Sequence, residues 1–341
     1  MSLRRAAVLA AAVLLVLAVG IALSFRPGDR DVVVVYTSVD QVFSEPVFRT
    51  CEAETGLIVR AVFDTEETKS TGVLSRLVAE ASAPQADVFW SGDPVRPFVL
   101  MGRGLVEPYR SSVAAGIPDA FRATDGTWTG FAARARVLLV NTDRVQAAEM
   151  PTSIRDLGAP RWRGQTAIAN PVFGTTTMHV AALFAAWGDD EARGFLAALR
   201  DNDVRVAASN GEVKRLVASG EVAFGLTDTD DAHEAIRGGA PVTVVYPDPD
   251  DLGTLVMPTT VVLVSGGPSP TAGRQLIDCL LGPEVERQMA DSAAHMPLRP
   301  DVATPPGVRT VSSIRAMQVD YEQVASTMER VQPMLRQWVG M

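Results

Sequence analysis

The chain has 341 residues, of which 47% are hydrophobic and 21% charged, a composition typical of a globular protein with room for two domains. Its formal net charge is −9, and no basic run follows residue 30. Because a nucleic-acid backbone is bound by clustered lysine and arginine, we expect no nucleic-acid partner.

The first 30 residues indicate export. Arg4 and Arg5 precede residues 6–25, an apolar run without a charged residue. A short basic stretch followed by an apolar run is typical of a secretory signal. About 20 apolar residues also suffice to span a bilayer, so cleavage and retention as a membrane anchor both stay open. We expect the rest of the chain to be periplasmic or extracellular.

The two cysteines, Cys51 and Cys279, would then lie in an oxidising compartment, where a disulfide is permitted. They occupy the apolar helical contexts "VFRTCEAETG" and "RQLIDCLLGP". Two buried free thiols fit these contexts as well as a bridge does, so both states stay open.

In chain order, the first elements alternate between strand and helix. Residues 32–38, "VVVVYTS", form a β-branched run typical of a buried strand. Helix, strand, helix, strand and helix follow at 40–56, 57–63, 69–82, 86–91 and 94–104. This βαβαβ order predicts a parallel, doubly wound sheet, in which ligands bind beyond the carboxyl ends of the strands.

The second half repeats the alternation after an extended run at residues 130–142, which we expect to cross from one lobe to the other. Predicted strands lie at 165–171, 204–209, 222–228, 241–247 and 259–266, and predicted helices at 175–188, 211–220, 271–282 and within 311–338. We therefore expect lobe 1 from residues 31–138 and 257–300, lobe 2 from 139–256, and a C-terminal helical segment at 301–341 that packs on the lobes.

Polar side chains gather where the predicted strands end. They are Thr37, Ser38 and Asp40 after the first strand, residues 64–71 after the second, Ser91 and Asp93 at the third, and Asp228, Thr229, Asp230 and Asp231 after the strand at 222–228. Carboxylates and hydroxyls suit a hard cation or a ligand ammonium group. The alternative is that each aspartate only caps the helix that follows it.

Gly174, Thr175, Thr176 and Thr177 open the predicted helix at 175–188. Backbone N–H groups and hydroxyls at the positive end of a helix dipole favour an anion or a carboxylate. The alternative is that Thr175 is only a helix cap.

Several landmarks occur together in this order: "VVVVYTS", "APQADVFWS", "LGAPRWRGQTAIANP", "ASGEVAFGLTD" and "HMPLRP". Over roughly residues 31–300 the chain resembles the substrate-binding proteins of ABC importers, in the ferric-ion-binding branch that also holds thiamine- and aminoethylphosphonate-type binders. The resemblance implies an α/β, two-lobed type II periplasmic-binding-protein fold. Each lobe would be a doubly wound mixed sheet flanked by helices, with the ligand cleft between the lobes.

The resemblance also implies roles for single residues. The ferric binders hold iron with two adjacent tyrosines, whose positions fall here on Asp230 and Asp231. Their histidine position falls near Asp40, and their glutamate position falls at Gly92, next to Asp93. Because all the usual iron ligands are changed, phenolate binding of Fe(III) is not expected, and the four aspartates are candidates for a metal or for a cationic ligand group.

The anion contacts of that branch are better matched. Residues 174–177, Asn210 and Asp228 fall where its members hold a phosphate or carbonate. A bound Fe or Ca ion with such an anion is therefore a possible cargo, and no other cofactor is expected.

Two other groups of side chains are expected to have no direct role in ligand binding. Arg134 and Arg136 alternate on the crossing strand, and we expect them to face the surface. The alternative is that one of them reaches the cleft and clamps an anion. His179, His233 and His295 lack a metal-ligand spacing and are expected to be structural.

We expect a monomeric, extracytoplasmic substrate-binding protein of an ABC importer. It would close as a hinge around a small anionic or zwitterionic solute, or a metal–anion complex, and deliver it to a membrane permease. No catalytic motif is present, so an enzyme is not expected. The alternatives are a ferric-iron-binding protein with non-tyrosine ligands and a membrane-anchored ligand sensor.

Overall fold

The computed structural model of the protein describes residues 31–64 and 72–341. The predicted export or anchor segment at residues 1–30 lies outside these ranges, and so does most of the predicted loop at 64–71. None of the described helices has the length and apolar character needed to span a bilayer.

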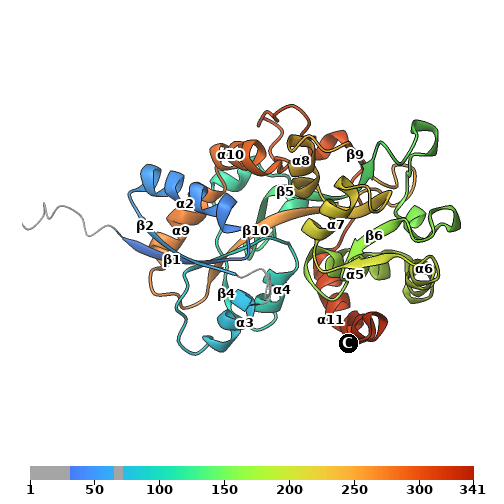
Figure 1. The fold of residues 1–341 in the computed structure, drawn as a ribbon. Helices are drawn as coiled ribbons and strands as arrows, with labels where there is room; N and C mark the ends of the chain where they lie inside the picture. The colour runs from blue at the N-terminus through green and yellow to red at the C-terminus, as the bar shows by residue number, and fades with distance from the viewer. Residues whose placement is uncertain (1–30, 65–71) are drawn as a thin grey trace, which may run out of the picture.

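The elements alternate largely as predicted (Figure 1). The strands are β1 (Val32–Thr37), β2 (Ile58–Phe63), β3 (Val88–Ser91), β4 (Val106–Glu107), β5 (Thr129–Asn141), β6 (Thr166–Ala169), β7 (Arg205–Ala207), β8 (Phe224–Asp228), β9 (Val242–Val245) and β10 (Val256–Val264). The α-helices are α2 (Gln41–Thr55), α3 (Gly72–Ala79), α4 (Arg96–Met101), α5 (Gly174–Trp187), α6 (Asp189–Asp201), α7 (Asn210–Ala218), α8 (Thr229–Arg237), α9 (Pro270–Leu280), α10 (Pro283–Ala293) and α11 (Tyr321–Val339).

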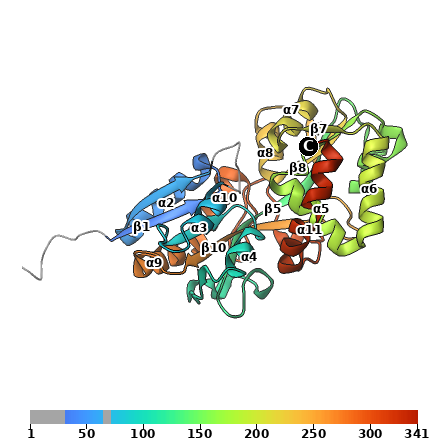
Figure 2. The ribbon, with the colours of Figure 1, turned by 90° about the horizontal axis from the view of Figure 1, so that it is seen from below.

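Lobe 1 is built on a mixed sheet in the order β2-β1-β3-β10-β5. β1 is parallel to both β2 and β3, and β10 is antiparallel to β3 and β5. Val33 and Val35 on β1 pack in one core cluster with residues of α2 and α9, while Tyr36 packs in a second cluster with residues of α3 and α4. The predicted doubly wound arrangement is confirmed, with helices on both faces of the sheet (Figure 2).

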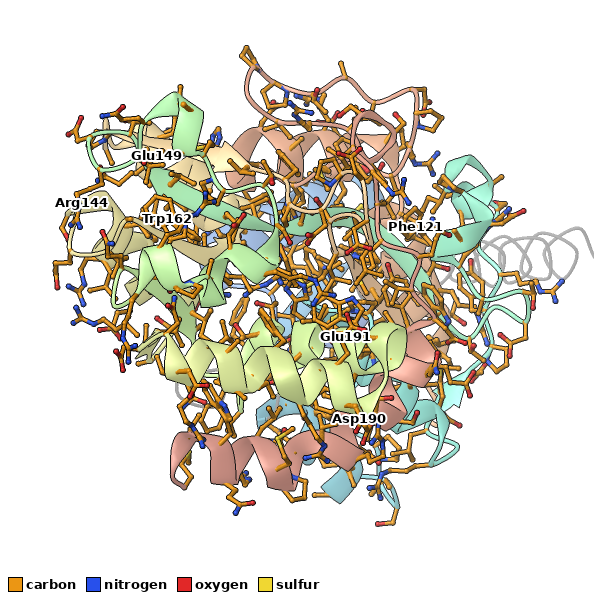
Figure 3. All side chains as sticks on the ribbon, turned by 90° about the vertical axis from the view of Figure 1, so that its right-hand side faces the viewer. Phe121, Arg144, Glu149, Trp162, Asp190 and Glu191 are labelled. Carbon is orange, nitrogen blue, oxygen red and sulfur yellow. A yellow bond between two sulfur atoms is a disulfide. The ribbon has the colours of Figure 1, made fainter. Side chains whose placement is uncertain are left out.

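Lobe 2 has its own mixed sheet, in which β5 and β8 are antiparallel and β8, β6 and β7 are parallel. Apolar residues of α5 and α6 belong to one core cluster, and those of α7 and α8 belong to the other. The α6 helix begins with Asp189, Asp190 and Glu191, whose charges complement the positive end of the helix dipole. Asp190 and Glu191 are labelled in Figure 3.

The strand β5 belongs to both sheets. Its first half pairs with β10 as far as Ala135, and from Arg136 onward it pairs with β8. A register shift in β10 falls opposite Ala132, which has a φ of 45°. The buried carboxylate of Glu286 accepts a hydrogen bond from the Ala132 backbone N–H at 2.9 Å, so α10 holds this irregular point in place. β5 therefore carries the chain between the lobes and positions the side chains that follow Ala132.

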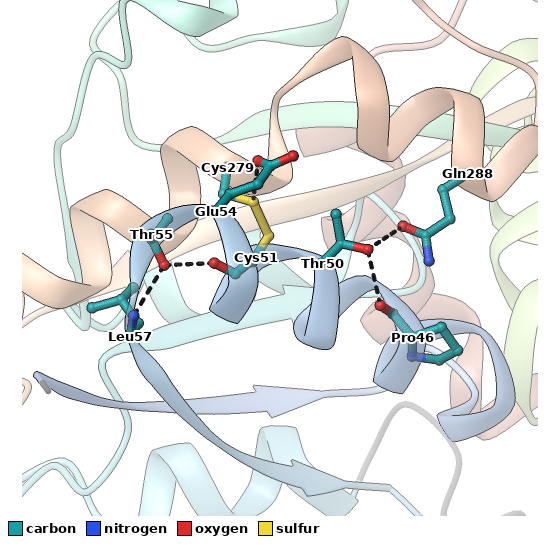
Figure 4. Close-up of a disulfide and its surroundings, with 8 residues drawn as sticks. All are labelled: Pro46, Thr50, Cys51, Glu54, Thr55, Leu57, Cys279 and Gln288. Atoms are coloured by element: carbon teal, nitrogen blue, oxygen red, sulfur yellow. Dashed lines mark hydrogen bonds between the residues drawn. A yellow bond between two sulfur atoms is a disulfide. The ribbon is translucent and has the colours of Figure 1, made fainter.

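Cys51 and Cys279 form a disulfide that joins α2 to α9, with their Cα atoms 5.8 Å apart (Figure 4). The open question of bridge or free thiols is thus settled as a bridge, within lobe 1.

The C-terminal helix is shorter than the pattern at residues 311–338 suggests. Asp320 caps α11 by accepting hydrogen bonds from the N–H groups of Glu322 and Gln323, so the helix begins at Tyr321. α11 lies against α5 and α6, where Trp338 donates to the Leu196 carbonyl at 3.0 Å.

Candidate ligand-binding cleft

A cleft of about 1120 Å³ lies where the carboxyl ends of strands from both lobes meet. It is lined from lobe 1 by Ser38, Asp40, Val42, Phe43 and Gly92, from lobe 2 by residues 169–170, 173–176, 208–211, 228 and 230–231, and elsewhere by Arg134, Thr259 and His295 among others. Its position agrees with the expectation that ligands bind beyond the strand ends at the centre of a doubly wound fold. Its volume slightly exceeds the range of about 300–1,000 Å³ that is usual for small-molecule sites.

Three helices of lobe 2 begin at this cleft. α5 has no side-chain cap, and Gly174 at its first position has a φ of 62°, which favours glycine. α7 is capped by Ser209, which accepts from the Glu212 N–H. α8 again lacks a side-chain cap. The positive ends of three helix dipoles therefore face one cavity.

Arg136 is fully buried beneath these helix ends and is the centre of a hydrogen-bond network. Its guanidinium donates to the hydroxyls of Thr175 at 3.0 Å and Thr176 at 3.1 Å. It also donates to the amide oxygen of Asn210 at 3.1 Å and to the carboxylate of Asp228. A single side chain of β5 thus ties α5, α7 and β8 together.

Arg134 reaches the cleft two residues earlier on β5. It donates to Asp228 at 3.1 Å, to Asp230 at 3.3 Å and to the Gly92 carbonyl at 2.7 Å. The expectation that Arg134 and Arg136 face the surface is wrong. β5 lies between strands of both sheets, so this face of the strand is turned into the protein.

Adjacent carboxylates of the "TDTDD" segment differ in electrostatic environment. Burial alone would raise the pKa of Asp228, but the charges of Arg136 and Arg134 outweigh it and hold this pKa below its usual range. Burial raises the pKa of Asp230, and the opposing charge of Arg134 does not offset the effect. For Asp231, burial together with the charges of Asp230 and Asp228 raises the pKa to about 7.

Asp231 has two weaker partners. Thr227 donates its hydroxyl to the Asp231 carboxylate at 3.1 Å, and the Lys214 ammonium lies 3.6 Å from it while also pairing with Glu234. The negative charges of Asp230 and Asp231 are therefore less fully compensated by protein cations than the charge of Asp228 is.

Nine of the fourteen predicted site residues line the cleft: Ser38, Asp40, Gly174, Thr175, Thr176, Asn210, Asp228, Asp230 and Asp231. Asp40 stands at the N-cap position of α2 without a side-chain capping bond, so the capping alternative does not account for it.

The other five are turned away from the cleft and make internal hydrogen bonds or pack in the core. Asp93 accepts from the N–H groups of Val95 and Arg96 and pairs with the Arg96 guanidinium at 2.9 Å, as the capping alternative anticipates. The hydroxyls of Thr37, Ser91 and Thr229 accept backbone N–H bonds from Val39, Asp93 and Ala135, and Thr177 is buried.

Among the residues that the structure describes, no three histidine, cysteine, aspartate or glutamate side chains are grouped so that they could hold a metal ion. His295 lines the cleft, where burial and the neighbouring Arg134 lower its pKa to about 3 and its Nδ1 lies 3.0 Å from the Ala132 carbonyl.

Apolar residues also contribute to the cleft, although the sequence analysis did not assign them to it. Val42 on lobe 1 is 70% exposed, and Phe173 on lobe 2 is 46% exposed. Val42 lies in the first turn of α2, and Phe173 is the N-cap residue of α5. Their position beside the predicted polar loops is the only signal that the sequence offers for them.

Comparison with known proteins places the chain in a family. Residues 84–321 match the family model described as "Bacterial extracellular solute-binding protein". The iron uptake protein A1 of Synechocystis is 26% identical over 80% of this chain and 77% of its own length. A putative 2-aminoethylphosphonate-binding periplasmic protein of Salmonella typhimurium is 27% identical over 73% of this chain and 72% of its own.

Solved structures support the same fold. The iron-bound HitA of Pseudomonas aeruginosa superposes with a TM-score of 0.81 at 20% identity, covering 89% of this chain and 99% of HitA. The two-lobed fold predicted from the sequence is confirmed. With strands, helix starts and cleft arranged in this way and a family model matching more than half of its length, the chain belongs to the bacterial extracellular solute-binding protein family.

Proposed function

We propose that this protein captures a small zwitterionic solute outside the cytoplasm and delivers it to the permease of an ABC importer. The acid group of the solute lies at the N-termini of α5 and α7, where Gly174 and Asn210 line the cleft. Its amino group lies between Asp230 and Asp231. The lobes, divided along β5, close around the bound solute.

This proposal rests on a difference among the three cleft carboxylates: nearby arginines compensate the charge of one of them and not the charges of the other two. Asp228 is neutralised by two arginines, whereas the pKa values of Asp230 and Asp231 are raised because burial and mutual repulsion disfavour their charges. A ligand ammonium group placed beside them supplies the missing positive charge. The uncapped N-terminus of α5 offers backbone donors to an acid group in the same cleft.

A metal–anion cargo is supported less well by the side chains of this chain. Asp93, one of the four candidate metal ligands, is held by Arg96 and the first turn of α4. Iron is named for one relative and 2-aminoethylphosphonate, a zwitterion, for another. The donors of this cleft match the second chemistry.

Calorimetric titration of the purified protein tests the proposal with a panel of 2-aminoethylphosphonate, α-amino acids, ethylphosphonate, propionate and ferric citrate. We expect a zwitterion to bind and its amine-free analogue to bind far more weakly. The double variant Asp230→Asn with Asp231→Asn loses at least about tenfold in affinity for the zwitterion, because a hydrogen bond to a charged group contributes about 1.5–3 kcal/mol.

Asp250→Asn is the matched control, since it removes the charge of an exposed aspartate that lies outside the cleft lining, and its affinity should equal that of the native protein. The proposal fails if amine-free anions bind as tightly as zwitterions, or if ferric citrate alone binds. It also fails if Asp250→Asn weakens binding as much as the double variant does.

A further inference from the structure

The most heavily hydrogen-bonded side chain in the cleft is the carboxylate of Asp228. It accepts from Arg134 Nη1 at 3.1 Å, from Arg136 Nη1, from Thr175 Oγ1 at 3.0 Å and from Asn210 Nδ2 at 3.2 Å. These donors come from β5, α5 and α7. Asp228 is only 1% exposed although it belongs to the cleft lining.

Local structure does not require this arrangement. Asp228 stands at the N-cap position of α8 with φ −99° and ψ 159°, a backbone conformation from which aspartate usually caps its own helix. Its side chain makes no such capping bond. The carboxylate instead turns away from α8 toward the two arginines.

The four donors form an anion-binding set. Two guanidinium groups, one hydroxyl and one amide N–H converge on a pair of oxygen atoms, and charge-assisted hydrogen bonds of this kind are the strong ones in proteins. The remaining bonds of the guanidiniums anchor them, since Arg134 also donates to the Gly92 carbonyl and Arg136 to Thr176. The donors are thus held in place by contacts other than those to Asp228.

We propose that Asp228 is a built-in anion that occupies a carboxylate-binding subsite formed by Arg134, Arg136, Thr175 and Asn210. An acid group of a ligand is thereby excluded from both arginines and must bind at the helix N-termini instead. Asp228 is then a specificity-determining residue: it converts a cleft with two buried arginines into one that selects for a positive group. The occupation of the subsite by Asp228 concerns the chain's own side chains alone, whereas the selection for a positive group rests on the proposed function.

Replacement of the carboxylate by a free anion of the same shape tests the proposal. Asp228→Ala leaves a space that fits formate, and Asp228→Gly leaves a space that fits acetate. We expect the melting temperature of Asp228→Ala to rise with formate and that of Asp228→Gly to rise with acetate, both saturably. Formate should bind Asp228→Ala at least about tenfold more tightly than the native protein.

Asp228→Asn is the control, because its amide fills the same space and leaves no room for formate. Sodium chloride at equal ionic strength controls for screening. If Asp228→Ala is unfolded without an anion, the yield of folded protein after refolding with and without formate replaces the melting curve. The inference is overturned if formate acts equally on Asp228→Ala, Asp228→Asn and the native protein, or if it restores no folded Asp228→Ala. Because no cargo enters this experiment, its failure is distinct from failure of the proposed function.

Discussion

At the residue scale, the cleft shows how neighbouring aspartates acquire different chemistry from their surroundings. Asp228 lies between two arginines, which hold its pKa below the usual range, whereas Asp231 is paired with the Lys214 ammonium at 3.6 Å and with a threonine hydroxyl. Burial and the charges of Asp230 and Asp228 disfavour ionisation of Asp231 and raise its pKa to about 7.

The raised pKa of Asp231 makes the stability of the ligand-free protein depend on pH. Its pKa is about 7 in the folded protein and about 3.9 in an unfolded chain, so the folded state binds more protons between these values. The free energy of unfolding should therefore fall as pH rises from about 4 to about 7, and Asp231→Asn should remove this contribution.

Urea denaturation of both proteins at pH 5 and pH 8 measures the effect. We expect Asp231→Asn to be more stable than the native protein at pH 8, by roughly 1 kcal/mol or more because each pKa unit corresponds to about 1.4 kcal/mol, and the gap to narrow at pH 5. An equal difference at both pH values would contradict this assignment.

At the element scale, β5 positions residues of the cleft, whereas the disulfide cross-links lobe 1. β5 links the lobes and presents Arg134 and Arg136 to the cleft, and Glu286 of α10 fixes its irregular point at Ala132. The disulfide joins α2 and α9 inside lobe 1 and lies outside the cleft lining. Stability and ligand binding should thus respond to different changes.

Removal of the disulfide should lower stability without changing the cleft. Because a cross-link restricts the unfolded chain, Cys51→Ser with Cys279→Ser should reduce the free energy of unfolding by about 2–4 kcal/mol. Guanidinium denaturation measures this loss, and reduction of the native protein should reproduce it. Ligand affinity should stay unchanged. Equal stability of the variant and the native protein would show that the disulfide does not stabilise the fold. A parallel loss of ligand affinity would show that the disulfide also affects the cleft.

At the scale of the whole molecule, two sheets share one strand and enclose a cleft that both lobes line. Exposed Val42 and Phe173 belong to opposite walls of that cleft. Approach of the lobes would cover this apolar surface, which favours closure once a ligand has neutralised the carboxylates.

Small-angle X-ray scattering tests the closure. A saturating zwitterionic ligand identified by titration should reduce the radius of gyration of the native protein. Asp230→Asn with Asp231→Asn, which lacks the two carboxylates proposed to hold the ligand ammonium group, should keep its ligand-free radius at the same ligand concentration. Binding without any change in radius would show that the cleft accepts its ligand without hinge motion.

Much of this molecule follows from local pattern alone. The β-branched runs, the helical spacing and the Gly174 helix start predicted the order of elements, because hydrophobic periodicity and turn chemistry act within a few residues. The element order and the motif resemblance together predicted the two-lobed fold, and strand ends predicted where the polar cleft lies.

The choice of partners depended on the tertiary structure. The fold brings together groups that are distant in sequence, such as Asp228 and Arg136, which are 92 residues apart. These contacts decide whether Asp228 binds Arg136 or caps α8. They also decide whether Asp93 caps a helix and whether Cys51 pairs with Cys279. Adjacent aspartates look alike in sequence. Burial and the position of two arginines on a shared strand give them different charges, and that long-range electrostatic environment exists only in the folded protein.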